Sequence, residues 1–368
     1  MNHYDVVIVG GGAAGLMLAR ELGKFKCSTL ILDRKKDLLD FSFNTLGSFI
    51  NLDDFDLTEN VVAQKIDQFV ITSRSFQNSI KAKAYILDKK KLHEELLNSL
   101  DSEYVTVLTG VSVTDIKTSK NGGFGAVTDK RGNEYSGKFF VDASGTIGVI
   151  SKKLGLVDKK PPLATGVEYN VEYKGDPSKA YLLLGKDYEG GYGWIFPLKN
   201  KRAIIGFGSF EEKVIKELKA RLNKVLELKS IKKLVVKDNE KVEGGSIPIT
   251  PVIDKFVLNN LVCVGDSVSQ VNPIVGEGYK FIFESAVMAS KAIQKSIQSE
   301  NLEFLSEYEN EWRERFLANY KRSKRSQEII FGMSRNNFFI DMGIILSKFR
   351  SNKKNLKSLS GEYDLKKI

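Results

Sequence analysis

The feature of the chain that most constrains its fold is a glycine-rich turn close to the N-terminus. Residues 4–9 (YDVVIV) have the continuous β-branched character of a strand that is buried in a parallel sheet. The strand leads into residues 10–15 (GGGAAG), and this turn leads into a helical pattern from Leu16 to about Lys24. A second apolar strand, residues 28–32, follows and is succeeded by an acidic residue. This order predicts a Rossmann-like unit that binds a dinucleotide.

Each position of this unit has a physical role in holding a dinucleotide. Gly10 permits the tight turn, Gly12 lets the backbone approach a pyrophosphate, and Gly15 allows close packing of the helix on the strand. The start of the helix offers free N–H groups and a positive dipole end to the phosphates. Asp33, eighteen residues after Gly15, can accept hydrogen bonds from the adenosine ribose. The unit does not decide between NAD and FAD, and its candidate contacts are Gly10, Gly12, Ala13, Ala14, Gly15, Asp33 and Arg34.

A second glycine-rich segment follows a strand in the last third of the chain. Residues 261–264 (LVCV) have the composition of a buried strand and are followed by Gly265 and Asp266. Pro273 and residues 276–278 (GEG) then precede a helical pattern. The apolar side chains of that pattern fall on one face of the helix, and they are Phe283, Ala286, Val287, Ile293 and Ile297.

A third element lies between these two, at residues 139–145 (FFVDASG). It is a short apolar strand followed by a turn that contains Asp142 and Gly145, and the segment from Val149 to Leu156 predicts a helix. Three such elements in this order resemble the cofactor domain of the para-hydroxybenzoate-hydroxylase-like flavoproteins. A plain NAD dehydrogenase would lack the last of them, so the resemblance implies FAD as the cofactor.

The same resemblance assigns roles to the residues beside the flavin. Asp266 is expected to hydrogen-bond the ribityl chain, and Gly276 and Gly278 to let the backbone reach the flavin ring. The start of the following helix would place partial positive charge beside N1 and O2, which favours the anionic reduced flavin. The further cofactor contacts that the resemblance implies are Thr45, Lys89, Val113, Asp142, Gly145, Gly265, Pro273 and Tyr279.

Lys89 has two interpretations. It lies in residues 88–92 (DKKKL), where these flavoproteins usually carry an arginine that contacts the cofactor, and a lysine there gives up bidentate geometry. The same residues also fit a solvated lysine run that opens a helix. In the family pattern Val111 to Val113 would lie beside the adenine, on the strand after that helix.

From Ala164 onward the hydrophobic pattern changes to a period of two, which predicts a half-buried antiparallel strand. Its apolar members are Val167, Tyr169, Val171 and Tyr173, and its polar members are Glu168, Asn170 and Glu172. Further strands are expected at 179–184, 193–198 and 202–207, with a turn at 200–201. A helix with Val214, Leu218, Leu222 and Val225 on one face closes the group, which forms an insert that would cover the flavin.

Within this insert, residues 181–197 resemble the signature of the geranylgeranyl reductase family. An aromatic residue is followed at a fixed distance by Gly-Gly-aromatic-x-Trp-x-Phe-Pro. In that family the motif lines a long apolar cavity beside the flavin, where the polyprenyl tail lies. Large rigid aromatic side chains bury alkene surface, and glycines leave room for a chain to thread. The residues that carry the motif here are Tyr181, Gly190, Gly191, Tyr192, Trp194, Phe196 and Pro197.

The resemblance extends along nearly the whole chain. Residues 244–248 (GGSIP) are similar to the family's return to the cofactor domain, and residues 308–315 (YENEWRER) to its C-terminal helix. One departure is the stretch 40–47, which has no cysteine where many archaeal members carry one near the flavin. The departure allows a paralogue with another substrate.

The sequence therefore predicts an α/β protein of the para-hydroxybenzoate-hydroxylase-like type. It has a Rossmann-like FAD-binding domain with an inserted antiparallel-sheet substrate domain and a C-terminal helical segment. The FAD-binding domain is expected at residues 1–45, 85–160 and 245–297, the substrate domain at 46–84 and 161–244, and the helical region at 298–368.

Composition narrows the range of partners. Lysine and arginine outnumber aspartate and glutamate by 56 to 46, and the net charge of +10 fits either a solvated lysine-rich surface or contact with an anionic membrane or substrate. No nucleic-acid-binding motif accompanies this charge. Two cysteines and two histidines are too few and too scattered for a disulfide framework or an ordinary metal site, and they are Cys27, Cys263, His3 and His93.

The expected location is the cytoplasm, with peripheral contact at the inner face of the membrane as a further option. No segment approaches the ~18 consecutive apolar residues that a membrane span needs, and the N-terminus does not resemble a secretion signal. The tail from Arg313 to Lys354 alternates basic clusters with apolar runs. This pattern fits either core-packing helices or a basic amphipathic face that rests on lipid headgroups.

The resemblance implies a reductase that saturates C=C bonds of a geranylgeranyl chain in membrane-lipid biosynthesis. Reduced FAD would deliver hydride from N5, with NAD(P)H or reduced ferredoxin as electron donor. No acid stands out as the proton donor, so water or a tyrosine such as Tyr192 would supply the proton. The alternatives are a non-catalytic flavoprotein and a flavin-dependent monooxygenase or halogenase. Halogenases have a similar Trp-x-Trp-x-Ile-Pro element, from which Tyr192 and Phe196 depart.

Overall fold

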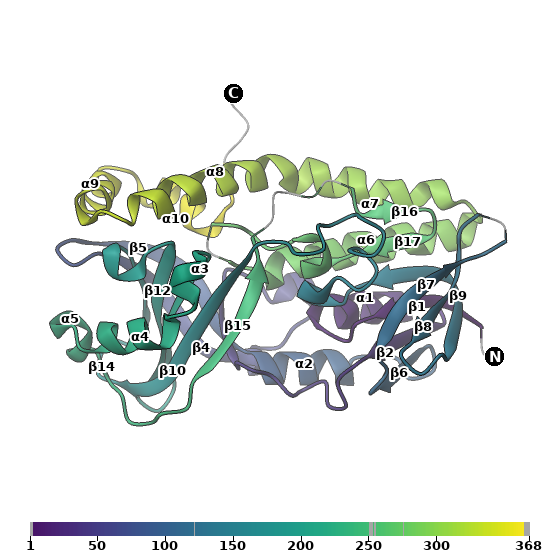
Figure 1. Cartoon of the computed structure of the whole chain (residues 1–368), viewed down its shortest axis with the longest axis horizontal. Coiled ribbons are helices and arrows are strands. Elements are labelled where there is room, and N and C mark those ends of the chain that lie inside the picture. The colour runs from purple at the N-terminus through teal and green to yellow at the C-terminus, as the bar shows by residue number, and fades with distance from the viewer. Residues whose placement is uncertain (1–2, 121, 250–252, 254, 275, 364–368) are drawn as a thin grey trace.

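The computed structural model describes residues 3–120, 122–249, 253, 255–274 and 276–363. Two β-sheets lie next to each other along the long axis of the molecule (Figure 1). The helix α8 (Ala318–Met333) runs along one side of the molecule and leads from the half that contains β1 to the half that contains β12 (Figure 1). The predicted fold class is confirmed: a mixed α/β body with two sheets and a helical C-terminal region.

The first sheet is mainly parallel and contains the N-terminal strand. Its order is β16–β17–β9–β1–β2–β6, with β8 and β7 continuing from β9. Strands β17, β9, β1, β2 and β6 are parallel to one another. The strands of this sheet are β1 (His3–Val9), β2 (Thr29–Asp33), β6 (Val105–Thr109), β7 (Val113–Thr118), β8 (Phe124–Asp129), β9 (Glu134–Asp142), β16 (Val257–Leu258) and β17 (Leu261–Cys263).

Three helices pack with this sheet, namely α1 (Ala13–Lys24), α2 (Lys89–Asn98) and α6 (Tyr279–Ser299), and α1 contacts both of the others. Residues 6–9 of β1 are all buried. A parallel strand with apolar cover on both faces needs such a continuous apolar run rather than alternation. The predicted first helix is confirmed, and it begins at Ala13 rather than Leu16.

The second sheet is mainly antiparallel. Its order is β14–β10–β13–β12–β11–β4–β5–β3, with β15 paired to β10, while β4 and β11 form a parallel pair. Its strands are β3 (Thr45–Ser48), β4 (Val62–Thr72), β5 (Gln77–Asp88), β10 (Leu163–Tyr173), β11 (Lys179–Leu183), β12 (Gly191–Leu198), β13 (Arg202–Ser209), β14 (Val235–Val236) and β15 (Glu243–Pro248). The predicted turn between β12 and β13 is confirmed, because Asn200 and Lys201 both have a positive φ.

Short helices cover one face of the second sheet. The predicted single helix is divided into α3 (Glu212–Ile215) and α4 (Leu218–Leu226), and α5 (Lys229–Lys232) follows. Its four predicted apolar residues are buried in one cluster with Tyr169, Val171 and Tyr173 of β10. The alternation of β10 is therefore confirmed for its apolar members, whereas Glu168 is a buried exception among the polar ones.

The C-terminal region is helical and has two different environments. Its elements are α7 (Leu305–Trp312), a π-helical segment (Arg313–Leu317), α8, α9 (Asn337–Lys348) and α10 (Asn352–Ser360). Tyr308, Trp312 and Tyr320 are buried in the main core, so the first part of the tail packs as core helices. The apolar run in α9 remains largely exposed. Within the described part of the chain, no helix is long and apolar enough to cross a bilayer.

The structure departs from the predicted elements at one further point. Val149 to Leu156 forms a series of turns, not a helix. Gly148 and Gly155 adopt positive φ values, and the Asp142 carboxylate accepts hydrogen bonds from the backbone of Ile150 and Ser151. The short 3₁₀ helices of the chain are Asp53–Phe55, Glu59–Val61, Gly145–Ile147, Lys186–Tyr188, Gly265–Val268 and Leu302–Phe304.

The predicted domain limits lie near the passages between the two sheets. The limit at 84/85 falls inside β5 and the limit at 244/245 falls inside β15, so each of these strands belongs to the second sheet on both sides of the limit. Residues 244–248 thus pair with β10 before the chain returns to the first sheet.

Candidate active site

Three segments that are distant in sequence end at one edge of the first sheet. In the parallel register Val9 lies opposite Asp142, and Asp142 lies opposite Cys263. The turns that follow β1, β9 and β17 therefore leave the sheet side by side. Ligands of open parallel sheets bind at this carboxyl edge, and all three predicted cofactor motifs meet there.

The glycines of the first turn are required by close approach. A Cβ atom at Gly10 would lie 2.3 Å from the Ala143 carbonyl oxygen, and one at Gly15 would lie 2.0 Å from the Gly10 carbonyl oxygen. Gly265 similarly packs against Ala14, because a Cβ there would lie 3.0 Å from the Ala14 Cβ. By contrast, a Cβ at Gly12 or Gly145 would meet nothing within 4 Å. Gly10, Gly15 and Gly265 thus serve protein packing, while Gly12 and Gly145 border open space.

Asp33 and Asp142 both organise backbone at this edge. Asp33 accepts hydrogen bonds from the Gly11 N–H at 2.7 Å and the Lys35 N–H at 2.7 Å, which ties the first turn to the end of β2. Asp142 is fully buried, and its carboxylate accepts from the Ser144 hydroxyl at 2.5 Å and the Ser151 N–H at 2.7 Å. The geometry thus gives Asp142 the role of shaping the loop that carries Gly145.

Lys89 and Asp266 supply opposite charges beside this edge. The Lys89 ammonium lies 3.8 Å from the centre of the Phe43 ring and 4.6 Å from that of Phe41. Burial, and then the nearby Lys35, lower the pKa of Lys89 to about 8. Burial raises the pKa of Asp266 to about 6, against the opposing effect of Lys89.

Lys89 is distinct from the two lysines that follow it. Asp88 caps α2 by accepting a hydrogen bond from the Lys91 N–H, and Lys90 and Lys91 are exposed. The helix-opening interpretation therefore holds for the run as a whole, while the Lys89 side chain is half-buried over aromatic rings. No described residue donates a hydrogen bond to the Asp266 carboxylate, which leaves it available to hydroxyl groups of a ligand.

Two buried side chains, His93 and Glu277, lie beside the start of α6. His93 and Tyr279 share a hydrogen bond of 2.9 Å between Nε2 and the phenolic oxygen. Burial lowers the pKa of His93 to about 3, so its imidazole is neutral. Glu277 accepts hydrogen bonds from the Ser48 hydroxyl at 2.6 Å and the Phe49 N–H at 2.7 Å, and burial raises its pKa to about 7. Sequence reasoning missed Glu277 and His93, although Glu277 lies inside the GEG segment.

A first cavity of about 200 Å³ opens beside the second sheet, next to the turn that precedes α6. Its walls come from β3, β10, β12, β15 and the turn before α6, with α8 at one side. The lining is aromatic and glycine-rich, and its members include Phe43, Thr45, Gly166, Glu168, Gly190, Gly191, Tyr192, Trp194, Phe196, Ile247, Pro273, Gly276 and Phe331.

The reductase-like motif is divided between the two faces of the second sheet. Tyr192, Trp194 and Phe196 alternate along β12 and face the first cavity, as a strand period of two requires. Tyr181 and Pro197 are not among the residues that line this cavity. Tyr181 packs with the cluster under α4, because its neighbours on β11 occupy the cavity side.

The Trp194 indole packs against glycines of the neighbouring strands. A Cβ atom at Gly206 would lie 2.2 Å from the indole, and one at Gly166 would lie 2.9 Å from it. The indole N–H donates to Glu168 Oε2 at 3.1 Å, while Oε1 of Glu168 has no partner among the described residues. Burial raises the pKa of Glu168 to about 7. An acid with a pKa near neutral pH thus stands among the aromatic side chains and glycines of this lining.

Tyr192 and Phe331 separate the first cavity from a second one. Their rings stack with centres 6.2 Å apart, and both residues line both cavities together with Ile274. The second cavity has a volume of about 220 Å³ and extends beneath α9. Its lining is aliphatic for the most part and includes Ile71, Ile80, Leu182, Ile330, Ile340, Ile344 and Leu359.

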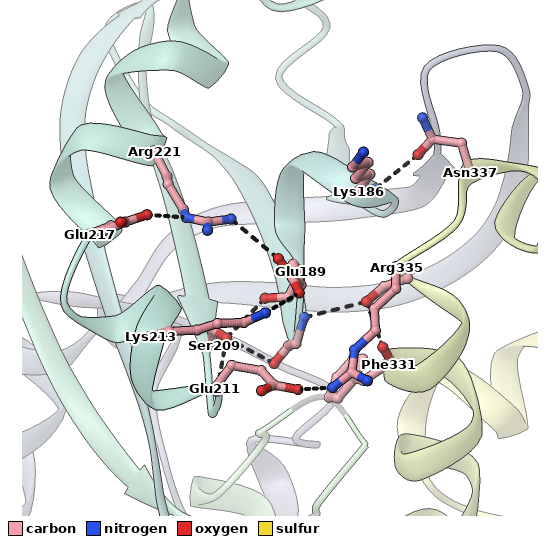
Figure 2. A network of polar contacts seen from close by, with 12 residues as sticks. Lys186, Glu189, Ser209, Glu211, Lys213, Glu217, Arg221, Phe331, Arg335 and Asn337 are labelled. Atoms are coloured by element: carbon pink, nitrogen blue, oxygen red, sulfur yellow. Dashed lines mark hydrogen bonds and ion pairs between the residues drawn. The ribbon is translucent and has the colours of Figure 1, made fainter.

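Polar contacts fasten the Gly190 loop to the junction between α8 and α9 (Figure 2). The Gly190 N–H donates to the Ser334 hydroxyl at 3.3 Å, and Arg335 forms an ion pair with Glu211 at 2.6 Å. The Lys186 N–H donates to Asn337 at 2.8 Å (Figure 2). These contacts hold the C-terminal helices beside the aromatic motif.

The remaining predicted cofactor residues have different environments. Arg34 is exposed, and Val113 packs into the core with its side chain buried. Thr45 lines the first cavity, and its hydroxyl has no partner among the described residues. Pro273 also lines this cavity, and its carbonyl accepts a hydrogen bond from Gln327. Gly278 is the residue that precedes the first turn of α6.

These observations fit FAD. Gly12 and Gly145 leave open backbone where a pyrophosphate would pass, and α1 begins there without a side-chain cap. Asp266 offers an unused carboxylate for ribityl hydroxyls. Among the described residues no group of histidine, cysteine, aspartate and glutamate is placed to hold a metal ion. The fold and the site define an FAD-dependent oxidoreductase whose second sheet encloses an apolar cavity.

The family follows from comparison with known proteins. A family model described as "Lycopene cyclase protein" matches residues 5–347, and the chain belongs to this family. The chain is 26% identical to digeranylgeranylglycerophospholipid reductase 2 of Methanothermobacter thermautotrophicus, with 90% of this chain and 88% of that protein covered. It is 27% identical to digeranylgeranylglycerophospholipid reductase of Methanococcus vannielii, with 86% and 85% covered.

Solved structures share the fold. A geranylgeranyl bacteriochlorophyll reductase-like protein from Thermoplasma acidophilum superposes with a TM-score of 0.86 at 21% identity, covering 99% of this chain and 97% of that one. The flavin-dependent brominase Bmp2 has a TM-score of 0.75 at 17% identity, covering 98% and 94%. PqsL, a probable FAD-dependent monooxygenase from Pseudomonas aeruginosa, has a TM-score of 0.73 at 16% identity, covering 94% and 100%.

Proposed function

We propose that the protein is an FAD-dependent reductase that saturates C=C bonds of a geranylgeranyl chain carried by a membrane lipid. The observation that carries the proposal is the first cavity, where the aromatic face of β12 meets the glycine turn at Gly276 and a single buried acid, Glu168. An isoprenoid alkene needs an apolar aromatic wall, a hydride source and a proton source. The reductase names of the curated relatives support this substrate class.

The cofactor-binding role rests on the residues at the carboxyl edge of the first sheet. Gly12, Ala13 and Ala14 would receive the pyrophosphate, and Asp266 the ribityl chain. Gly276 would let the backbone lie close to the flavin ring, and the protein's own packing also requires glycine there, because a Cβ would lie 2.6 Å from Ile247. FAD in this position would supply the hydride, and NAD(P)H or reduced ferredoxin would supply the electrons to it.

The residues of the chain would position the alkene and provide its proton. Tyr192, Trp194 and Phe196 would bury the isoprenoid surface and exclude water, which favours a single orientation of the double bond. One alkene carbon receives the hydride and the other receives a proton, so each double bond gains two hydrogens. The Trp194 N–H fixes one oxygen of Glu168, and the other oxygen faces no described partner.

Glu168 is the stronger candidate for the proton donor than Tyr192. Burial raises the pKa of Glu168 to about 7, where a carboxyl group both holds and releases a proton near neutral pH. Burial, and then the charge of Glu277, raise the pKa of the Tyr192 phenol above its ordinary value of 10. A phenol with so high a pKa is a poor acid at neutral pH. We therefore assign Tyr192 to substrate packing and the proton to Glu168.

The test is an anaerobic single-turnover experiment. The purified protein is reduced with dithionite, mixed with geranylgeranyl-bearing glycerophospholipid in detergent micelles, and followed by flavin absorbance and product mass. We expect the flavin to reoxidise without oxygen and the lipid to gain two hydrogens per double bond. Reoxidation only after air is admitted, with oxygen or halogen in the product, would instead establish a monooxygenase or halogenase.

Glu168 also favours a second candidate function, an isomerase or cyclase that only protonates the alkene. A protonated carboxyl group in an apolar cavity is what such a reaction needs, and the matching family model bears a cyclase description. The same experiment separates the two candidates. An isomerisation leaves the mass of the lipid unchanged and the reduced flavin unconsumed, whereas a reduction changes both.

A further inference from the structure

One helix near the C-terminus exposes a continuous apolar face. In α9 and the residue that follows it, Phe338, Phe339, Met342, Leu346 and Phe349 are exposed, and we refer to these five side chains as the α9 apolar face. Phe338, Leu346 and Phe349 are 64%, 59% and 84% exposed. At roughly 100° per residue the five positions fall within one third of the helix circumference.

The opposite face of α9 is fixed to the protein. Ile340 and Ile344 are buried and line the second cavity. Asp341 accepts a hydrogen bond from the Ser73 hydroxyl, and Asn78 donates to the Ser347 hydroxyl at 2.8 Å. The helix is therefore held in one orientation, and its apolar face points away from the rest of the chain. An exposed apolar surface of this kind marks an interaction site.

The charges that follow this face along the chain have one sign, whereas Asp341 within α9 is engaged by Ser73. Between Met342 and Gly361 the chain contains five basic residues and no acidic residue. Lys348, Arg350, Lys353 and Lys354 are exposed next to the apolar side chains. Aromatic and aliphatic side chains beside lysines and arginines form the pattern by which a helix lies in the interface of an anionic bilayer.

The helix that carries this face also covers an apolar cavity. The second cavity lies directly beneath α9, and Arg350 and Ser347 belong to its lining. It meets the first cavity at Tyr192 and Phe331. A lipid chain that passes α9 from a bilayer would thus find aliphatic surroundings in the second cavity.

We propose that the α9 apolar face docks on an anionic lipid bilayer and directs the second cavity toward the membrane. A second copy of the chain fits this surface less well. A symmetric dimer would bring the same patch together on both subunits, and the four exposed basic residues of one copy would then face those of the other. An anionic bilayer satisfies both the apolar and the basic side chains.

Vesicle flotation with the full-length protein tests the proposal. One set of vesicles contains phosphatidylcholine and phosphatidylglycerol in equal parts, and the other contains phosphatidylcholine alone. We expect the protein to float with the anionic vesicles. The double variant Phe338→Ser/Phe349→Ser should lose affinity for these vesicles by about tenfold or more. The matched control Leu302→Ser removes an exposed leucine distant from α9 and should bind as the parent protein does.

A charge pair of variants tests the electrostatic part. Lys348→Glu/Lys353→Glu should lose binding to anionic vesicles by about tenfold or more at low salt, whereas Lys219→Glu/Lys229→Glu changes net charge equally on α4 and α5 and should not. Equal effects of both pairs would overturn a specific docking surface. Absence of binding by the parent protein, or a dimer in light scattering that Phe338→Ser/Phe349→Ser dissociates, would overturn the bilayer as the occupant. Flotation involves no turnover, so its outcome is independent of the reductase assay.

Discussion

Glu168 lies on β10 between Val167 and Tyr169, in a strand where Asn170 and Glu172 face solvent. Its carboxyl group is nevertheless buried, because Gly166, Gly206 and Gly208 let the Trp194 indole lie flat against the sheet and cover it. Burial disfavours the charged form, and this raises the pKa to about 7 from an ordinary value of 4.5. Glu168 thereby becomes a candidate acid, which its sequence position does not indicate.

Replacing Glu168 by Gln should remove the proton source while preserving the hydrogen bond from Trp194. We expect flavin reoxidation by the isoprenoid lipid to slow by about 10²–10⁴-fold. In the parent protein the rate should fall as pH rises through 7, because the carboxyl group then loses its proton. The variant should lack this pH dependence. An unchanged rate and pH profile in stopped-flow measurements would exclude Glu168 as the donor.

His93 provides a second residue-scale prediction. Burial, with Lys89 and Lys35 nearby, lowers its pKa to about 3. The unfolded imidazole takes up a proton below about 6.5 and the folded one does not, so its contribution to stability is present above 6.5 and is lost as pH falls from 6.5 toward 3. In ¹⁵N-histidine NMR we expect the His93 signals, assigned with His93→Gln, to stay neutral at pH 5. Titration of these signals near pH 6.5 would contradict the burial.

At the scale of elements, the glycines of the first turn and of α1 differ in what requires them. Some are required by close packing within the protein, and others border open space where a ligand would lie. Gly15 touches the Gly10 carbonyl, so a side chain there would push the helix from the strand. Gly12 has an extended backbone that any residue adopts, with φ −83° and ψ −170°, and open space beside it. Its glycine identity is therefore not required by the packing of the protein itself, and the proposed pyrophosphate contact would account for it.

Gly12→Val and Gly15→Ala should consequently fail in different ways. We expect Gly12→Val to fold with the thermal midpoint of the FAD-free parent protein but to lose the stabilisation that added FAD provides. For the parent this stabilisation is about 2.7 kcal/mol at 100 times Kd. Gly15→Ala should lower the stability of the FAD-free protein itself by about 2 kcal/mol or more. Thermal unfolding with and without FAD measures both, and FAD stabilisation of Gly12→Val would refute the assignment.

At the scale of the whole molecule, polar side chains join segments that are far apart in sequence. Glu277 at the start of α6 accepts from Ser48 and Phe49, which connects the first sheet's last motif to the second sheet. Arg315 forms ion pairs with Glu284 of α6 at 3.0 Å and with Glu362 at 2.8 Å. The C-terminal segment is thereby fastened to the helix that starts at the proposed flavin site.

Arg315→Met tests this connection. Loss of the Arg315 guanidinium would leave the carboxylates of Glu284 and Glu362 near each other in a partly buried site. We expect a decrease in the free energy of unfolding of about 1–2 kcal/mol, below the cost for a fully buried pair because all three side chains retain some exposure. Arg74→Met breaks an exposed pair with Asp187 and should cost at most about 0.5 kcal/mol. Urea denaturation that shows equal effects would contradict the role of Arg315.

Much of the fold follows from local patterns. The run of residues 4–9, the glycines at 10–15 and the alternation after Ala164 each have a period or spacing that only one kind of element satisfies, so strands, helices and the order of the motifs were predictable. The helix expected at Val149 to Leu156 was wrong, because Gly155 adopts a positive φ and the backbone hydrogen bonds of Gly155 and Leu156 go to Lys152 and Ser151 instead of to the residues four positions earlier.

The sequence by itself determined the flavoprotein fold, the three cofactor motifs and the aromatic motif of β12, because these are encoded in contiguous residues. The tertiary structure alone decided which residues share a site. It turned Tyr181 away from the first cavity through strand alternation, buried Glu168 beneath Trp194, and left the α9 apolar face without cover. Burial and pairing between distant segments depend on how sheets and helices pack, and no local pattern carries that information.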